Sequence, residues 1–507
     1  MLEQRGMLVV HGRLSRLVLS AIMAALTCAA LAAPAGALEI GNVKVTRTVM
    51  GAPLVSPKES GVKVPGVGEV DLSKVGIIKI APSGARGKDK NILVLEPGTS
   101  AAAAYFVPFA KSLVEDPELS KHWQVWAVER RENFLENQKE LTRYKLGRVS
   151  SQELFDYYLG YLGGAEIKKH YEPVESSLVE FAKEWGMSVA VDDLKVVIDA
   201  AKELHGKVVL GGHSLGGSVV TAYATWDFGG QPGAQELSGL VYDDGGSSPL
   251  AMSKEEAQAS LARLDEPRET PWLAFGGIPA PDLGLFSVTG SALTAVEPKG
   301  RSQLEGFRFL PPDLRSPITP VTNEAGFGYS VNVGTSPESL IAAQIHGGEG
   351  VEEEPESDGL HGWNATGALT PVSRYAEMLS GEVSGTALHV SGSEWYFPAR
   401  LTLDTGAVGN GLSNPAQEVL GLRSTMGEHL PTSLRILAID SELDKLLGGE
   451  QTTLTEAELL AEQSGIPSGN LTLIEEKNAY AHNDPAGATP EINEFFKHMV
   501  PFLKEIA

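Results

Sequence analysis

A serine framed by glycines, in the run Gly-His-Ser-Leu-Gly at residues 212–216, is the stretch whose residue types and spacing most directly suggest chemistry. A serine hydroxyl becomes a nucleophile when a neighbouring base takes its proton. A nucleophile on a sharp strand-to-helix turn needs glycine two residues to either side, because larger side chains would meet the adjoining strand and helix. Ser214 is therefore a candidate nucleophile, and a plain glycine-rich turn is the alternative.

The residues on either side of this motif fit a strand and a helix. Residues 208–210 are Val-Val-Leu, and residues 218–226 are rich in Ala, Val and Tyr. Strand, turn and helix in this order would place the N–H that follows Ser214 at a helix N-terminus, where negative charge is favoured. This context favours the nucleophile turn over a plain glycine-rich turn.

Further apolar runs predict the strands that must position such a serine. They lie at residues 75–80, 91–96, 123–128, 237–242, 434–439 and 470–474. Residues 189–204 have apolar residues near helical spacing and lead into the strand before Ser214. A strand, a helix and a strand over residues 91–128 indicate a parallel crossover. The fold class predicted is α/β.

The composition changes after residue 246, which predicts an insertion. We expect a core in two parts, residues 38–246 and 431–507, separated by a cap at residues 247–430 that is rich in Pro and Gly loops. The acidic run at residues 349–358 fits a solvated loop, because consecutive carboxylates without histidine partners do not form a metal site. No metal-ligand spacing, phosphate-binding loop or dinucleotide fingerprint is present, so we expect no cofactor and no metal.

Taken together, these features resemble the α/β-hydrolase superfamily over most of residues 75–507, the insertion excepted. The resemblance rests on the serine turn, on the Pro97-Gly98-Thr99 loop, on an acid after a late strand and on a histidine after the last strand. Their chain order, Ser, acid, His, is that of the superfamily. The resemblance implies a mostly parallel central sheet flanked by helices. It also implies a serine hydrolase whose expected substrates are carboxylic esters. A peptidase or amidase, or a non-catalytic binding protein of this fold, is the alternative.

The resemblance also implies the roles of individual residues. Ser214 would be the nucleophile and His482, in the loop after the last strand, its base. Asp444 lies where the usual acid of the superfamily falls, and Glu442 shares its loop. Asp243 and Asp244 follow the earlier strand, where some lipase-like members carry the acid. Which acid completes the triad is left open among these four, with Asp444 preferred.

Two backbone N–H groups should stabilise the oxyanion. By resemblance, Leu215 would provide one and Thr99 the other. The family's His-Gly pair is replaced here by Pro97-Gly98, which leaves Ser100 as an alternative donor. Of the neighbouring polar residues, we expect His213 to pack within the turn, and Asp484 to be a turn residue.

The N-terminus and the charge predict where the protein works. Residues 1–37 have a basic start, an apolar run and a small-residue cleavage site, which is typical of a secretory signal. The one cysteine, Cys28, lies inside this segment, so the mature chain should have no disulfides. Asp and Glu outnumber Lys and Arg by 65 to 41. We expect a secreted or periplasmic protein that has no stable membrane anchor after signal cleavage, binds a small-molecule or lipid-like ester and does not bind nucleic acid.

Overall fold

The computed structural model describes residues 38–507 apart from short gaps. The gaps are residues 85–89, 165, 247–250, 267–268, 276–277, 357, 384–385, 388–389, 444–452 and 477–478. The predicted signal segment, residues 1–37, therefore lies outside the described residues.

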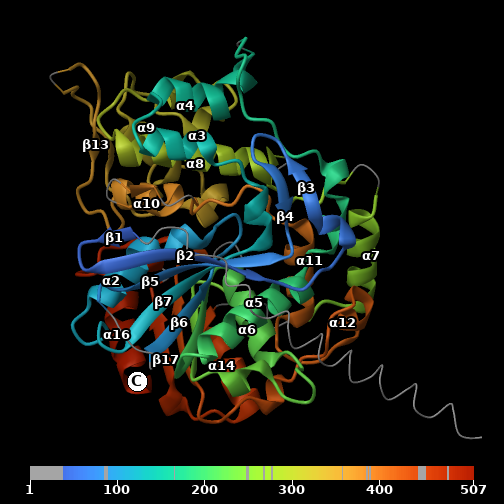
Figure 1. The fold of residues 1–507 in the computed structure, drawn as a ribbon. Coiled ribbons are helices and arrows are strands. Elements are labelled where there is room, and N and C mark those ends of the chain that lie inside the picture. Colours follow the sequence, from blue (N-terminus) through green and yellow to red (C-terminus); the bar gives the residue numbers. More distant parts are fainter. Residues whose placement is uncertain are drawn as a thin grey trace, which may run out of the picture.

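A nine-stranded sheet forms the centre of the molecule, with the order β1-β2-β5-β7-β6-β8-β9-β16-β17 (Figure 1). From β7 to β17 all neighbours are parallel, whereas β1, β2 and β5 form an antiparallel edge against β7. The strands are β1 (Leu38–Ile40), β2 (Val43–Gly51), β5 (Lys74–Pro82), β6 (Lys90–Glu96), β7 (Trp123–Glu129), β8 (His205–His213), β9 (Gly239–Asp243), β16 (Arg435–Asp440) and β17 (Leu471–Glu475). The predicted mostly parallel sheet is confirmed.

Helices cover both faces of the sheet because its central strands are apolar on both sides. In β6, Ile92 and Val94 face one apolar core, and Leu93 and Leu95 face the other. The first core is closed by α5 (Met187–Lys202), α6 (Leu215–Thr225) and α14 (Thr453–Ser464), and the second by α2 (Val107–Glu115) and α16 (Glu494–Ile506). Burial on both faces is the reason that these strands read as continuous apolar runs.

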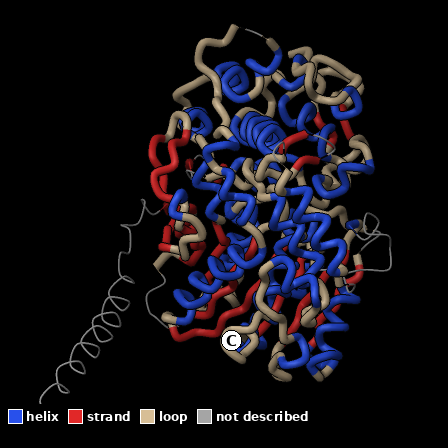
Figure 2. The backbone as a smooth tube through the Cα atoms, turned by 90° about the vertical axis from the view of Figure 1, so that its right-hand side faces the viewer, coloured by secondary structure: helices blue, strands red, loops and turns tan. Residues whose placement is uncertain are grey.

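The chain between β9 and β16 adds helices to two different parts of the molecule. Its middle part, with α8 (Ala280–Val296), α9 (Asn323–Val331) and α10 (Val372–Ser380), forms a layer above the sheet together with α3 (Lys139–Lys145) and α4 (Ser151–Tyr158) (Figure 1). Its outer parts, α7 (Lys254–Leu264), α11 (Ala399–Val408) and α12 (Pro415–Leu420), pack together, and α11 contacts α5 and α6. Seen from the side, the helical layer lies at one end of the molecule, away from the C-terminus (Figure 2).

The remaining elements are short. They are β3 (Ser60–Val64) and β4 (Gly68–Asp71), the pairs β10 (Ala274–Phe275) with β11 (Ile278–Pro279), β12 (Gly350–Val351) with β13 (Trp363–Asn364), β14 (Glu382–Val383) with β15 (Thr386–Ala387), and the helix α15 (Asp484–Gly487). Within the described part of the chain, we find no helix that combines the length and the apolar character needed to span a bilayer.

Candidate active site

Ser214 lies at the tip of the turn between β8 and α6, in a strained conformation. Its backbone angles are φ 54° and ψ −127°, and a non-glycine residue rarely has a positive φ. Its N–H donates to the carbonyl of Asp243 at 3.0 Å, which ties the turn to the end of the neighbouring strand β9. The side chain is half-buried. Strain of this kind is retained where a side chain has to be held in one place.

The glycines on either side of Ser214 allow this turn. A Cβ on Gly212 would meet the backbone of Gly216, and a Cβ on Gly216 would meet the carbonyl of Glu96. The loop after β6 also runs close to the serine, since a Cβ on Gly98 would lie 2.8 Å from the Cβ of Ser214. The spacing of two residues to either side, noted in the sequence, thus has the expected steric cause.

His482 is the second residue of the site, and Asp244 is bound to it. The imidazole Nδ1 and Asp244 Oδ2 are 2.6 Å apart, and the two side chains are 1% and 2% exposed. Asp244 also accepts the N–H of Ser441 at 2.6 Å and the hydroxyl of the same residue. A buried carboxylate on Nδ1 holds the ring in the tautomer whose Nε2 is free to act as a base.

The carboxylate bound to His482 is that of Asp244, one of the four acids that the sequence left open. The sequence had favoured Asp444. Asp444 lies outside the described residues, so its predicted role stays a prediction. Glu442 donates its backbone N–H to the carbonyl of Tyr480 at 3.0 Å. Asp243 is buried, its Oδ1 has no hydrogen-bond partner, and burial together with the neighbouring carboxylate of Asp244 raises its pKa well above the usual range. Burial and the Asp244 carboxylate thus disfavour the charged form of Asp243.

The serine and the histidine are linked through their neighbours. His213 donates from Nε2 to the carbonyl of His482 at 3.1 Å, and the two rings are 4.4 Å apart between centroids. Among the described residues, no hydrogen bond joins the Ser214 hydroxyl directly to the His482 ring; in enzymes without substrate this bond is often long. His213 packs within the turn as predicted, against Tyr105, and burial lowers its pKa well below the usual range. A neutral His213 adds no charge beside the base.

Backbone donors of the expected kind surround Ser214. Leu215 is the first residue of α6, so its N–H has no acceptor within the helix. Thr99 and Ser100 lie in the turn that follows β6, and Ser100 has a positive φ of 55°. The carbonyl of Ser100 accepts the N–H of Glu394 at 2.9 Å. The roles of Leu215 and Thr99 stay predictions at this point.

Asp484 is more than the turn residue that the sequence suggested. It is fully buried and accepts from the N–H of Ala481 at 2.7 Å and from the hydroxyl of Thr370 at 2.7 Å. Its Oδ2 also lies 2.7 Å from Nδ1 of His346. Asp484 therefore ties the loop that holds His482 to the insertion. Its place in the sequence, two residues after the histidine, is the signal for this role.

The described residues contain no group of three or more His, Cys, Asp or Glu side chains placed to hold a metal ion.

No family model and no curated protein sequence matches the chain. Solved structures show a likeness. A Sulfolobus solfataricus protein described as a candidate lipase is 13% identical, with 93% of this chain and 97% of that chain covered and a TM-score of 0.45.

Two further structures are similar in the same way. The peroxisomal α/β-hydrolase of Saccharomyces cerevisiae is 10% identical, with 92% of this chain and 90% of that chain covered and a TM-score of 0.38. A highly thermostable carboxyl esterase from Bacillus coagulans, in complex with glycerol, is 11% identical, with coverages of 93% and 97% and a TM-score of 0.33. At these identities the likeness concerns the fold alone.

Proposed function

We propose that this chain, which has the α/β-hydrolase fold, is a serine hydrolase that cleaves carboxylic esters. One observation carries the proposal. His482 Nδ1 and Asp244 Oδ2 are 2.6 Å apart and buried, and the residue before Asp244 accepts the N–H of Ser214, a serine held at φ 54° between a strand and a helix. A histidine polarised by a carboxylate next to a strained serine is the arrangement that activates a hydroxyl for acyl transfer.

The reaction would proceed through an acyl-enzyme. Ser214 Oγ attacks the acyl carbon while His482 Nε2 takes its proton, and the same nitrogen returns that proton to the alcohol that leaves. Asp244 accepts from Nδ1–H and stabilises the imidazolium that forms. The N–H groups of Leu215 and Thr99 donate to the oxygen that becomes negative. Water, deprotonated by His482, then attacks the acyl carbon and releases the acid and the free Ser214 hydroxyl. No cofactor takes part.

We assign the acid of the triad to Asp244. Two features support the assignment over the alternatives. The carboxylate is held by both the N–H and the hydroxyl of Ser441, so that it faces His482 without rearrangement. The neighbouring Asp243 is buried, its Oδ1 has no hydrogen-bond partner, and burial together with Asp244 raises its pKa, which disfavours the charged form that the triad needs.

The proposal extends to the substrate class and to the place of action. The insertion supplies helices α8, α9 and α10, which form a layer on top of the core. We propose that the substrate is a small-molecule or lipid-like ester. The segment of residues 1–37 would direct export, so that the enzyme works in a periplasm or outside the cell.

Labelling with a fluorophosphonate tests this proposal. We expect the purified mature protein to form a covalent adduct on Ser214 and to hydrolyse short acyl esters faster than the matching amides. Ser214→Ala and His482→Ala should abolish both reactions. His498→Ala serves as the matched control, because His498 is exposed on α16 and lies in no part of the site. A folded protein that neither reacts with the probe nor cleaves esters would refute the proposal.

A further inference from the structure

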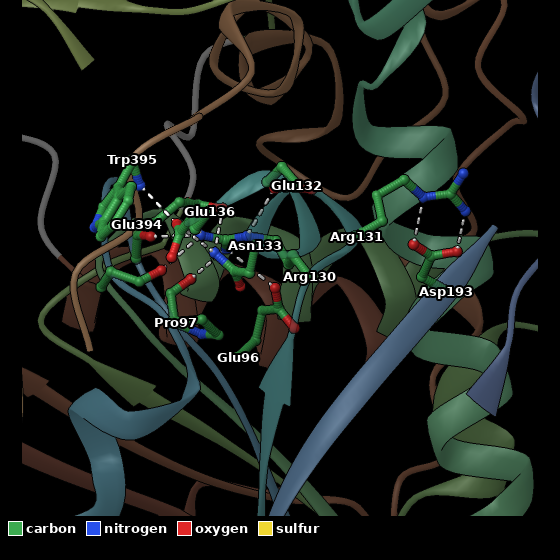
Figure 3. A network of polar contacts seen from close by, with 12 residues as sticks. Glu96, Pro97, Arg130, Arg131, Glu132, Asn133, Glu136, Asp193, Glu394 and Trp395 are labelled. Carbon is green, nitrogen blue, oxygen red and sulfur yellow. Dashed lines mark hydrogen bonds and ion pairs between the residues drawn. The ribbon is translucent and has the colours of Figure 1, made fainter. Parts of the chain in front are cut away.

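Arg130, directly after β7, is bound to the loop that passes Ser214. It is 5% exposed. Its guanidinium donates to three backbone carbonyls, those of Pro97 at 2.8 Å, Gly98 at 2.9 Å and Ala101 at 3.0 Å. These carbonyls lie on both sides of residues 99–100. One buried side chain therefore binds the loop after β6 on both sides of Thr99 and Ser100. Figure 3 shows Arg130 near Glu96 and Pro97, where this loop begins.

The bond to Gly98 has a direct consequence for Thr99. The carbonyl of Gly98 and the N–H of Thr99 belong to one planar trans peptide group, in which they point in opposite directions. Because the carbonyl is turned toward Arg130, the N–H of Thr99 has to point away from it. The same Gly98 packs against Ser214, with only 2.8 Å between a Cβ placed on the glycine and the Cβ of the serine. Of the two candidate donors, Thr99 is the one whose N–H direction this bond sets.

The insertion holds the same loop through Glu394. Its carboxylate Oε2 accepts from Arg130 at 2.6 Å, and its own N–H donates to the carbonyl of Ser100 at 2.9 Å. Two residues earlier, the carbonyl of Gly392 accepts the N–H of Ala102 at 2.8 Å. Glu394 is completely buried. The loop is thus held by the core through Arg130 and by the insertion through residues 392–394.

The charges around Arg130 keep its guanidinium ionised. Glu96 lies 3.2 Å from Nη1 and Glu132 lies 3.2 Å from Nε, in addition to Glu394. Burial lowers the pKa of Arg130, but these carboxylates more than offset it and the pKa is raised. A lysine could not replace this side chain, because its single ammonium lacks the planar fork that reaches three carbonyls and a carboxylate.

We propose that Arg130, oriented by Glu394, is a positioning residue for the oxyanion site: it holds the carbonyl of Gly98 so that the N–H of Thr99 faces the reacting carbonyl. The inference rests on the proposed hydrolase function. The insertion would then contribute to the oxyanion site, because Glu394 is needed together with Arg130 to fix the loop after β6.

The neighbouring arginine provides a matched control. Arg131 is 1% exposed, but its Nε donates to Asp193 at 2.9 Å and its Nη1 to Glu59 at 3.1 Å. Figure 3 shows the two side chains pointing to different partners, with Arg131 beside Asp193 and Arg130 beside Glu96 and Pro97. Both arginines are buried and paired, yet only Arg130 is bound to the loop.

The experiment compares Arg130→Lys with Arg131→Lys. We expect both variants to lower the melting temperature. Arg130→Lys should also lower kcat for a short acyl ester by about 10²-fold with little change in KM, since the loss of one oxyanion donor has an effect of this size. Its affinity for a boronic acid, which mimics the tetrahedral intermediate, should fall by a similar factor. Arg131→Lys should keep the wild-type kcat and the boronic acid affinity.

Glu394→Gln is the second variant, in case Arg130→Lys does not fold. This variant keeps the backbone hydrogen bond to Ser100 and removes only the negative charge of the side chain that pairs with Arg130. We therefore expect about a tenfold loss of kcat. Equal kcat values in the folded fractions of the Arg130, Glu394 and Arg131 variants would overturn the inference. Failure of the proposed function is distinguishable, because then the wild-type protein and Arg131→Lys would not react with the fluorophosphonate either.

Discussion

The proposed assignment of the acid depends on single residues. Asp243 and Asp244 are adjacent at the end of β9, yet only one of them reaches His482. Asp244 has a positive φ of 43°, which turns the chain at that point, and its carboxylate is held by Ser441. Asp243 uses its carbonyl to hold the N–H of Ser214. In the proposed mechanism, Asp243 thus holds the nucleophile through its backbone, and Asp244 holds the base through its side chain.

Replacement of the acid is the test at this scale. We expect Asp244→Asn to lower kcat by about 10⁴-fold, because an amide cannot favour the imidazole tautomer and imidazolium that the reaction needs. We expect Asp444→Asn to lower kcat far less. The rates of acyl ester hydrolysis by the two purified variants, each checked for folding by circular dichroism, provide the measurement. If Asp444→Asn loses its activity while Asp244→Asn stays active, the acid of the triad is Asp444 and the assignment to Asp244 is wrong.

At the scale of elements, the unit of β8, its turn and α6 depends on close contact with β6. The backbone of Gly216, in the first turn of α6, lies against the carbonyl of Glu96 at the end of that strand. No side chain fits between them. The strained turn at Ser214 is therefore supported by packing of backbone on backbone, and β6 itself is held in the parallel sheet on both sides.

Substitution of Gly216 by alanine tests this contact. The added methyl group has to displace backbone, so we expect Gly216→Ala to lower the free energy of unfolding by about 1–3 kcal/mol, the usual cost of overpacking. Urea denaturation measures the change. Gly469→Ala is the control, since a Cβ there meets no atom within 4 Å and should leave the stability nearly unchanged. Equal effects of the two substitutions would contradict the steric account of the turn.

On the scale of the whole molecule, buried carboxyl groups lie at the contact between the core and the insertion. Burial raises the pKa of Glu96 to about 7 and that of Glu136 to about 8. Glu136 accepts the N–H of Trp395, which follows Glu394 in the insertion (Figure 3). These groups keep their protons in the folded protein at pH values where the unfolded chain has lost them.

This difference predicts how stability depends on pH. Because the folded pKa values lie above the unfolded value of about 4.5, the contribution is fully present below pH 4.5 and is lost as the pH rises to about 8. Glu136→Gln cannot ionise, so its unfolding free energy should fall less steeply over this range than that of the wild type. Urea denaturation between pH 5 and 8 gives the pH dependence of the unfolding free energy for both proteins. Equal pH dependences would rule out a role for Glu136.

The strands and the serine turn could be predicted because they depend on local sequence. Continuous apolar runs identify strands buried on both faces, and the glycine spacing reflects contacts within one turn. The acid could not be assigned with the same means. Asp244 and Asp444 both follow a strand, and the choice depends on the backbone angle at Asp244 and on the position of His482, which lies far away in the sequence.

Arg130 was missed for a related reason. It lies in the charged run of residues 129–133, a composition that usually indicates exposure, whereas all five residues are buried. The partners of Arg130 come from the end of β6, from the loop after it and from the insertion, so they cannot be recognised from a local sequence pattern. The available signal was the position of the run directly after a buried strand, where charged side chains can turn back to a neighbouring loop.

The placement of the triad along the chain has a consequence for the making of the protein. Ser214 and Asp244 both come before the insertion, and His482 comes after β17, the last strand of the sheet. A chain still on the ribosome, before β17 has been made, holds the proposed nucleophile and acid but no base. An exported chain that crosses the membrane unfolded is likewise incomplete until that strand joins the sheet. On this assignment, every chain that ends before residue 482 lacks the base, so the triad can form only after the last strand of the sheet has been made.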